Sequence, residues 1–70
     1  MKYKAIYISD ENNKKTLGTF DDRSDAVNKL IEEASRNYCL DDEKERRLTM
    51  EFQDYCILGC GPSMIMIEEV

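Results

Sequence analysis

The sequence predicts one small α+β domain over residues 1–70: an antiparallel sheet of two hairpins, a main amphipathic helix on one sheet face and a weaker second helix. Short runs rich in β-branched and aromatic residues near both ends predict the strands, and an apolar stripe at helical spacing predicts the main helix. An apolar fraction of 41% favours a compact core over disorder. We expect the element order ββααββ, with ββαβββ as the alternative if residues 47–53 form a strand.

The first hairpin is predicted from "KYKAIYIS" (residues 2–9) and the returning run "TLGTF" (residues 16–20). Asn12 and Asn13 are expected at the centre of a two-residue turn, because asparagine tolerates a positive φ. This register would pair Ile8 with Leu17, Ala5 with Phe20, and Tyr7 with Gly18. It would place Ile6, Ile8 and Leu17 on one face of the sheet, and Tyr3, Ala5, Tyr7 and Phe20 on the other.

The main helix is predicted within "DDRSDAVNKLIEEASRNY" (residues 21–38). Asp22 can cap its N-terminus, with Asp25 three residues later in a capping-box arrangement. Its apolar stripe is formed by Ala26, Val27, Leu30, Ile31, Ala34 and Tyr38. The side chains expected to face water are Lys29, Glu32, Glu33 and Arg36.

The segment after this helix has two interpretations. Good helix formers from Glu43 to Arg47 favour a helix from about residue 42 to 53, capped by Asp41 or Asp42. The alternation of Leu48, Met50 and Phe52 is also compatible with a strand. We prefer the helix, in which one apolar face would comprise Leu48, Phe52, Tyr55 and Cys56.

The last hairpin is predicted from "YCIL" and "SMIMIEEV", joined by "GCGP", whose glycines and proline are typical of a turn. The three cysteines are Cys39, Cys56 and Cys60, and the chain has no histidine to complete a zinc site. We therefore expect no metal or other cofactor, with Cys56 in the core, Cys60 in the turn and Cys39 ending the main helix. Reduced thiols and no secretory signal point to the cytoplasm.

Several functional classes are disfavoured. With no histidine, P-loop, GxGxxG or EF-hand spacing, the chain is not expected to be an enzyme. Its net charge of −5 repels nucleic acid phosphates and anionic membranes, so we expect no direct nucleic-acid or membrane partner. No apolar run approaches the ~18 residues of a membrane span.

Two kinds of surface remain as candidate protein-interaction sites. The acidic candidates form two clusters. The first lies near the second helix and comprises Asp41, Asp42, Glu43 and Glu45. The second lies in the part of the chain that follows the last basic residue, Arg47, and comprises Glu51, Asp54, Glu68 and Glu69. The apolar candidates, on strands that carry apolar residues on both faces, are Tyr3, Tyr7, Met64 and Met66. The alternatives are that the acidic residues only keep the protein soluble, and that the second helix or the chain ends cover the second sheet face.

These residues identify no named family. In length, acidity and α+β pattern, with "LGTFDDRSDAVNKL" as strand followed by capped helix, the chain is similar to small acidic phage inhibitors of host defence such as anti-CRISPR proteins. That resemblance implies a protein-binding module from a phage or mobile element that blocks a basic, nucleic-acid-handling host protein. The first alternative is a self-associating domain or accessory subunit whose apolar strand face makes a homodimer. The second is a small thiolate metal-binding protein.

Overall fold

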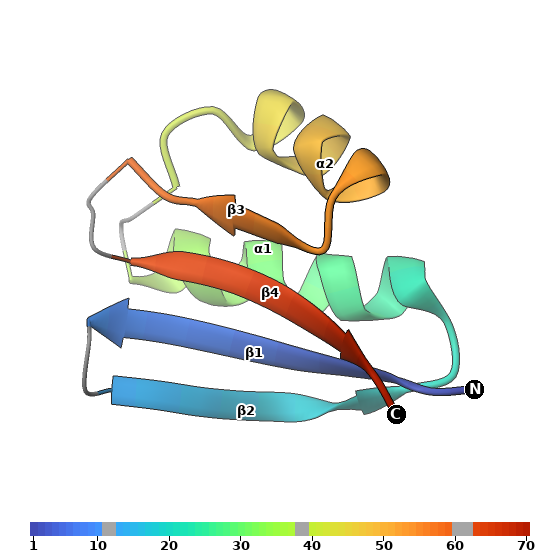
Figure 1. Cartoon of the computed structure of the whole chain (residues 1–70). Helices are drawn as coiled ribbons and strands as arrows, with labels where there is room; N and C mark the ends of the chain where they lie inside the picture. Colours follow the sequence, from blue (N-terminus) through green and yellow to red (C-terminus); the bar gives the residue numbers. More distant parts are fainter. Residues whose placement is uncertain (11–12, 38–39, 60–62) are drawn as a thin grey trace.

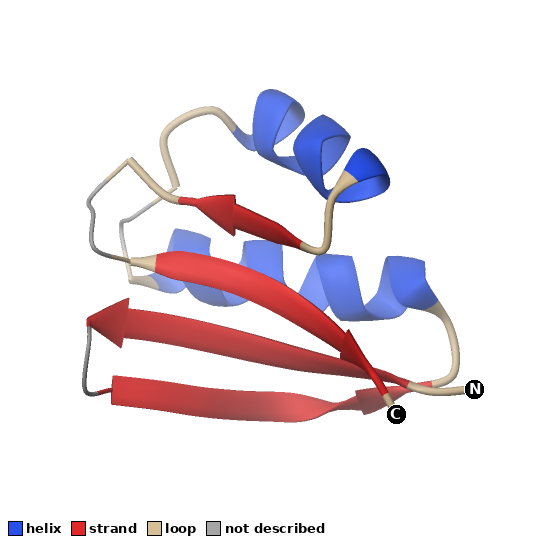
Figure 2. Ribbon diagram, viewed as in Figure 1, coloured by secondary structure: helices blue, strands red, loops and turns tan. Residues whose placement is uncertain are grey.

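The computed structural model describes residues 1–10, 13–37, 40–59 and 63–70 as a four-stranded antiparallel sheet with two helices. Its elements are β1 (Tyr3–Asp10), β2 (Asn13–Phe20), α1 (Arg23–Arg36), α2 (Glu43–Phe52), β3 (Tyr55–Ile57) and β4 (Met64–Glu69). The order ββααββ is confirmed, and residues 47–52 are helical rather than a strand. α1 lies behind the sheet in Figure 1, and α2 flanks β3; Figure 2 shows the same two layers by type of structure. In these ranges no helix has the length and apolar character needed to cross a membrane.

The two hairpins are joined through their first and last strands, in the order β2-β1-β4-β3. β1 pairs with β4 from Tyr3 opposite Glu69 to Ile8 opposite Met64. Backbone hydrogen bonds in both directions between Lys2 and Val70, of 3.1 and 2.8 Å, extend this ladder. Strands that are far apart in the sequence therefore form the centre of the sheet, and each hairpin supplies one edge strand.

The predicted register of the first hairpin is wrong. Asn13 belongs to β2 and faces Asp10, so it is not a central turn residue, while Asn12 lies outside the described residues. The pairs are Tyr3 with Phe20, Ala5 with Gly18, Tyr7 with Lys15, and Ile8 with Lys14.

An extra residue in β2 accounts for part of this difference. The register shifts between Ala5 and Ile6, whose partners are Gly18 and Thr16, so Leu17 has no partner in β1. Gly18 has φ 153°, a conformation that residues with a Cβ rarely adopt. Leu17 packs against the core next to α1, so its predicted place beside Ile6 and Ile8 is also wrong.

The core lies between the sheet and the helices. Alternate residues of the two central strands, Ala5 and Tyr7 on β1 and Ile65 and Ile67 on β4, are at most 5% exposed. They belong to one buried cluster with side chains from both helices and from the β3 region: Ala26, Leu30, Ile31, Ala34, Met50, Cys56 and Leu58. The buried strand position predicted for Cys56 is confirmed.

In α1 the structure confirms most of the predicted apolar stripe, but one residue predicted to face water is buried. Asp22 is the N-cap residue, but its side chain makes no capping hydrogen bond, so the capping box with Asp25 does not form. Glu33, expected to face water, is only 8% exposed. It turns toward the end of the first hairpin, where Lys15 lies 3.8 Å away. Tyr38 and Cys39 lie outside the described residues.

In α2 the predicted limits are confirmed and the predicted apolar face is wrong. The side chain of Asp42 accepts a hydrogen bond from the Glu45 amide and caps the helix. Met50 is the one α2 side chain that is fully buried, whereas Leu48 and Phe52 face solvent. Tyr55 and Cys56 belong to β3, because the helix ends at Phe52 and the chain continues in an extended conformation at Gln53.

Arg23 connects the start of α1 to the end of α2. Its guanidinium donates to the Met50 carbonyl at 2.9 Å, to the Gln53 carbonyl at 2.8 Å and to the Asp54 carboxylate at 2.8 Å. The carbonyls at a helix C-terminus have no partner within the helix, so these bonds satisfy groups that would otherwise need water. The Asp54 carbonyl in turn accepts from the Ile67 amide at 2.7 Å, which starts the pairing of β3 with β4.

We expect Arg23→Ala to lower the free energy of unfolding by about 2 kcal/mol, because it removes charge-assisted hydrogen bonds and leaves two carbonyls without a partner. Urea unfolding followed by circular dichroism measures this value. The control is Lys29→Ala, which removes only an exposed ion pair to Glu32 and should cost less than about 0.5 kcal/mol. Equal effects of the two substitutions would contradict the role given to Arg23.

Candidate protein-interaction surfaces

Three of the four residues in the first predicted acidic cluster have partners within the chain. Asp41 forms a two-point contact with Arg46, with Nε to Oδ1 and Nη2 to Oδ2 both at 3.2 Å. Asp42 caps α2, and Glu43 pairs with Arg47 at 3.3 Å. Glu45 is the exposed member for which the described structure shows no ion pair. The cluster therefore stabilises its own helix, and one of its carboxylates remains for a partner.

The Asp41–Arg46 pair also attaches the start of α2 to β3. A hydrogen bond from its own backbone amide, together with the Arg46 guanidinium, holds the pKa of the Asp41 carboxyl below its ordinary value of 3.8. Burial works to lower the pKa of Arg46, but its hydrogen bonds to Cys56 and Asp41 outweigh this and raise it. A Cβ at Gly59 would lie 2.6 Å from Oδ2 of Asp41, so a glycine there leaves room for the carboxylate.

The second predicted acidic cluster does not form one surface. Asp54 is paired with Arg23 at 2.8 Å. Glu51 lies on α2, while Glu68 and Glu69 follow each other on β4 and so point to opposite faces of the sheet. None of these three glutamates has an ion pair among the residues that the structure describes.

The four apolar candidates are divided between the two faces of the sheet. Tyr7 is 5% exposed in the core under α1, and Tyr3 is half-buried on the same face. Met64 and Met66 alternate with the buried Ile65 and therefore lie on the opposite face. Tyr7 is thus a core residue in this fold, and the two methionines are the members of the set on the side away from α1.

The outer face of α2 is one apolar surface that the sequence reasoning assigned to the core. Phe52 is 81% exposed and Leu48 is 55% exposed, and they lie one helical turn apart. Glu45 precedes Leu48 by three residues and Glu51 follows it by three, so carboxylates flank the apolar pair, and the exposed Lys44, four residues before Leu48, lies on the same side of the helix. We call Glu45, Leu48, Glu51 and Phe52 the outer face of α2. The sequence carries no signal for this orientation, because Leu48, Met50 and Phe52 are all apolar and only the structure shows that Met50 is the one buried.

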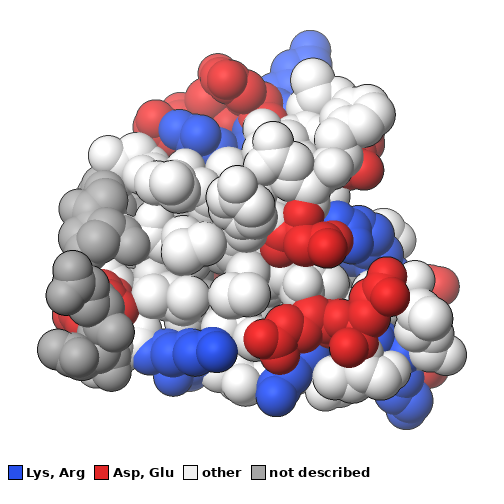
Figure 3. Space-filling model, in the orientation of Figure 1, with Lys and Arg blue, Asp and Glu red and all other residues white. Residues whose placement is uncertain are grey.

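The face of the sheet away from α1 is the second apolar surface. We call it the open sheet face: its central residues are Lys4, Ile6, Ile8, Tyr55, Ile57, Met64, Met66 and Glu68. Figure 3 looks onto it and shows uncharged atoms over the middle of the sheet, acidic atoms toward the C-terminal end of β4, and basic atoms along the β2 side. Tyr55 and Ile57 on the edge strand are 51% and 62% exposed, whereas Ile6 at the centre is 1% exposed. The sequence reasoning found the methionines of this face and missed its other members.

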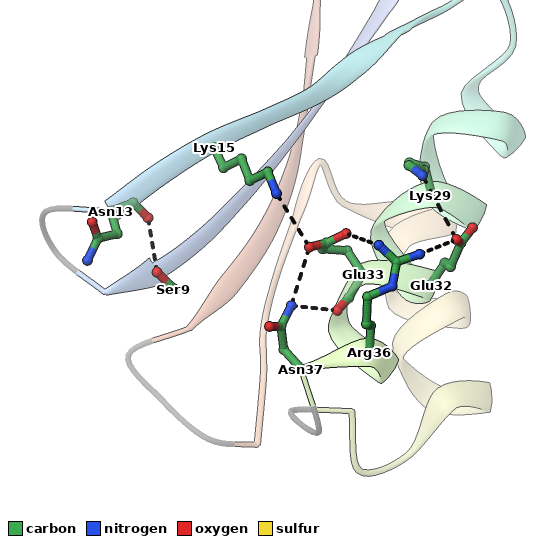
Figure 4. A network of polar contacts seen from close by, with 8 residues as sticks. All are labelled: Ser9, Asn13, Lys15, Lys29, Glu32, Glu33, Arg36 and Asn37. Carbon is green, nitrogen blue, oxygen red and sulfur yellow. Dashed lines mark hydrogen bonds and ion pairs between the residues drawn. The ribbon is translucent and has the colours of Figure 1, made fainter.

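A polar hollow of about 380 Å³ lies at the end of the first hairpin, lined by Tyr7, Ser9, Asn13, Lys14, Lys15, Glu33 and Asn37. Figure 4 shows that the Glu33 carboxylate inside it is surrounded by donors: Arg36 at 3.3 Å, Asn37 Nδ2 at 3.4 Å, and Lys15 at 3.8 Å. Asn37 also donates to the Glu33 backbone carbonyl at 2.8 Å. This network connects the end of α1 to β2 and gives the buried carboxylate a structural role.

Of the three cysteines, Cys56 lies among the residues that the structure describes. Cys56 is 3% exposed and accepts a contact from Arg46 at 3.8 Å, while Cys39 and Cys60 lie outside the described residues. In the described ranges no three Cys, Asp or Glu side chains gather as ligands for a metal ion.

The Leu58 amide donates a hydrogen bond to the Ser63 carbonyl at 2.9 Å, next to the last pair of the β3–β4 ladder, Ile57 with Met64.

Comparisons with protein-family models, with curated proteins and with solved structures found no match for this chain.

We expect Asp41→Asn to reduce the loss of stability in acid. Because the folded-state pKa of Asp41 is depressed, its ionised carboxylate, held by the backbone amide of Asp41 and by Arg46, contributes stability above the ordinary value of 3.8, and this contribution is lost as the pH falls through the folded-state pKa. Urea midpoints measured between about pH 6 and 2 should therefore fall less steeply for Asp41→Asn than for the wild type. Glu69→Gln, which removes a carboxylate with no ion pair in the described structure, is the control and should keep the wild-type slope.

Proposed function

We propose that this protein is a protein-binding module that docks the outer face of α2 onto a partner protein. The observation that carries the proposal is the exposure of Phe52 and Leu48, at 81% and 55%, on consecutive turns of a helix whose opposite side is anchored by Met50. A helix that presents apolar side chains at this spacing suits an apolar groove in a partner. Burying two such side chains would contribute about 1.5–3 kcal/mol each.

Charge indicates that the partner is basic. All four arginines are bound to groups of the same chain: Arg23 to Asp54, Arg36 to Glu32 and Glu33, Arg46 to Asp41, and Arg47 to Glu43. Glu45 and Glu51 beside the apolar pair have no such partner among the described residues. With a net charge of −5, the protein would be attracted to a positively charged surface and would associate faster at low salt.

The partner class that we propose is a basic host protein that handles nucleic acid. Its binding surface for phosphates is positively charged, and an acidic module that covers this surface would compete with nucleic acid. The role is then that of a cytoplasmic inhibitor encoded by a phage or mobile element. The chain itself would contact protein and not nucleic acid, because its own acidic field repels phosphates.

The test is affinity capture from a bacterial lysate with the wild-type protein and with Leu48→Ser/Phe52→Ser. We expect the wild type to retain a basic nucleic-acid-binding protein, and the double variant to lose at least about 90% of it, since a loss of 1.4 kcal/mol is tenfold in affinity. Val70→Ser/Lys29→Ala, which changes an apolar residue that is 62% exposed and a lysine of α1, both outside this surface, is the matched control. Capture of the same protein by wild type and double variant would contradict the assignment to α2.

The charge component has its own experiment. Glu45→Lys/Glu51→Lys should weaken binding of the captured protein by tenfold or more and should reduce the dependence of binding on salt, because the reversed charges oppose a basic surface. The purified partner is then offered a labelled oligonucleotide with and without this protein. Displacement of the oligonucleotide supports the inhibitory role, whereas a complex that keeps it bound would contradict inhibition and leave only protein binding.

A further inference from the structure

We propose that the open sheet face is a homodimer interface in which a second copy of this chain stacks its own open sheet face on the first. The two-fold axis would lie between β1 and β4, parallel to the strands. This inference goes beyond the proposed role of α2 and does not depend on it, because Leu48 and Phe52 belong to neither stacked face.

The first argument is the apolar surface itself. Six contiguous positions on three neighbouring strands are apolar: Ile6, Ile8, Met64, Met66, Tyr55 and Ile57. A sheet with one covered face normally carries polar residues on the other. Among the described residues, the polar positions on that side of the sheet lie on β2 and at the ends of β1 and β4. A surface of this kind indicates contact with another apolar surface rather than with water.

The second argument is charge complementarity, and it selects a copy of the same chain as the partner. Lys4 and Glu68 are register partners on β1 and β4, and neither has an ion pair within the described structure. A two-fold axis between these strands, parallel to them, exchanges the positions of β1 and β4. It therefore places Lys4 of each copy over the partner's Glu68, and forms two opposite-charge contacts from one pair of residues.

The same operation pairs the remaining positions of the face. Ile6 would lie over the partner's Met66, and Ile8 over the partner's Met64, because these are also register partners. β3 would lie over the partner's β2, since the two are the edges of the sheet. Tyr55 would lie over Thr16 of the other copy, because both belong to the row of paired residues that runs across the sheet through Met66 and Ile6. Ile57 would lie over Lys14 of the other copy, because both belong to the neighbouring row through Met64 and Ile8. The methylene stem of a lysine can cover an isoleucine while its ammonium group stays in water.

Size and geometry agree with this arrangement. Sheets that stack face to face keep their strands within about 30° of each other, as an axis parallel to the strands requires. The molecule measures 31 × 27 × 19 Å. Its four strands, the longest of eight residues, form a sheet face of roughly 500 Å² at ~3.3 Å per residue and ~4.8 Å between strands, which is the scale of a small interface beside the ~800 Å² per partner of a standard one. The two most exposed apolar side chains of the sheet, Tyr55 and Ile57, would be covered by the contact.

The experiment is native mass spectrometry and sedimentation of the wild type and of two charge-reversal variants. We expect the wild type to form a species of twice the 8.2 kDa chain mass. Lys4→Glu places glutamates against glutamates at both contacts, and Glu68→Lys places lysines against lysines, so each variant alone should dimerise at least about tenfold more weakly. Mixing the two variants restores both opposite-charge contacts. The mixture should therefore form the heterodimer in preference to either homodimer.

Circular dichroism of each variant tests whether it is folded, and Met66→Lys supplies a second disruption at the centre of the face. A wild type that stays monomeric up to about 100 μM, where even a weak dimer of Kd 10–100 μM would be populated, would overturn the inference. So would a dimer that survives all three substitutions, or a mixture that shows no preference for the heterodimer. None of these outcomes bears on α2, whose variants are tested by partner capture.

Discussion

The guanidinium of Arg23 joins parts of the chain that are 27 to 31 residues apart, and the junction of α2 and β3 is held by its hydrogen bonds. Its bonds to the Met50 and Gln53 carbonyls close the end of α2, and its bond to Asp54 holds the residue that precedes β3. Asp54 begins the pairing with β4, and β4 forms the centre of the sheet with β1. Arg23 therefore connects the end of α2, the start of the edge strand β3 and the start of α1.

Some charged side chains of this protein connect its helices and strands, and others lie at the surface without an ion pair among the described residues. The arginines and several carboxylates are used to attach elements to one another, as Asp41 and Arg46 attach α2 to β3, and Glu33 attaches α1 to β2 through Lys15. Both candidate surfaces carry charges without an ion pair in the described residues, Glu45 and Glu51 on α2 and Lys4 and Glu68 on the sheet, and others such as Asp22 and Asp25 lie elsewhere. An acidic composition alone does not distinguish these two uses, because ion pairs depend on which elements lie side by side.

The two proposed contacts would suit each other. A dimer formed through the open sheet faces would carry two copies of the outer face of α2. Two sites on one particle raise the apparent affinity for a partner that also presents repeated sites, without any new contact. A small chain with little core to stabilise it would also gain from a permanent partner, since burying the sheet face adds apolar contact that 70 residues cannot provide alone.

The sequence by itself determined the elements and their order, because the 3.6-residue stripe of α1, the cap at Asp42 and the alternation of β4 are local patterns that each element carries within it. It also placed Cys56 in the core. Only the tertiary structure decided the register of the first hairpin, the burial of Glu33, the pairing of β1 with β4 and the side of the sheet that stays uncovered. These features depend on contacts between distant residues: the bulge at Gly18 turns Leu17 inward, and Met50 rather than Leu48 meets the core because Arg23 and Arg46 fix the orientation of α2. Such contacts are settled by packing, which local periodicity does not encode.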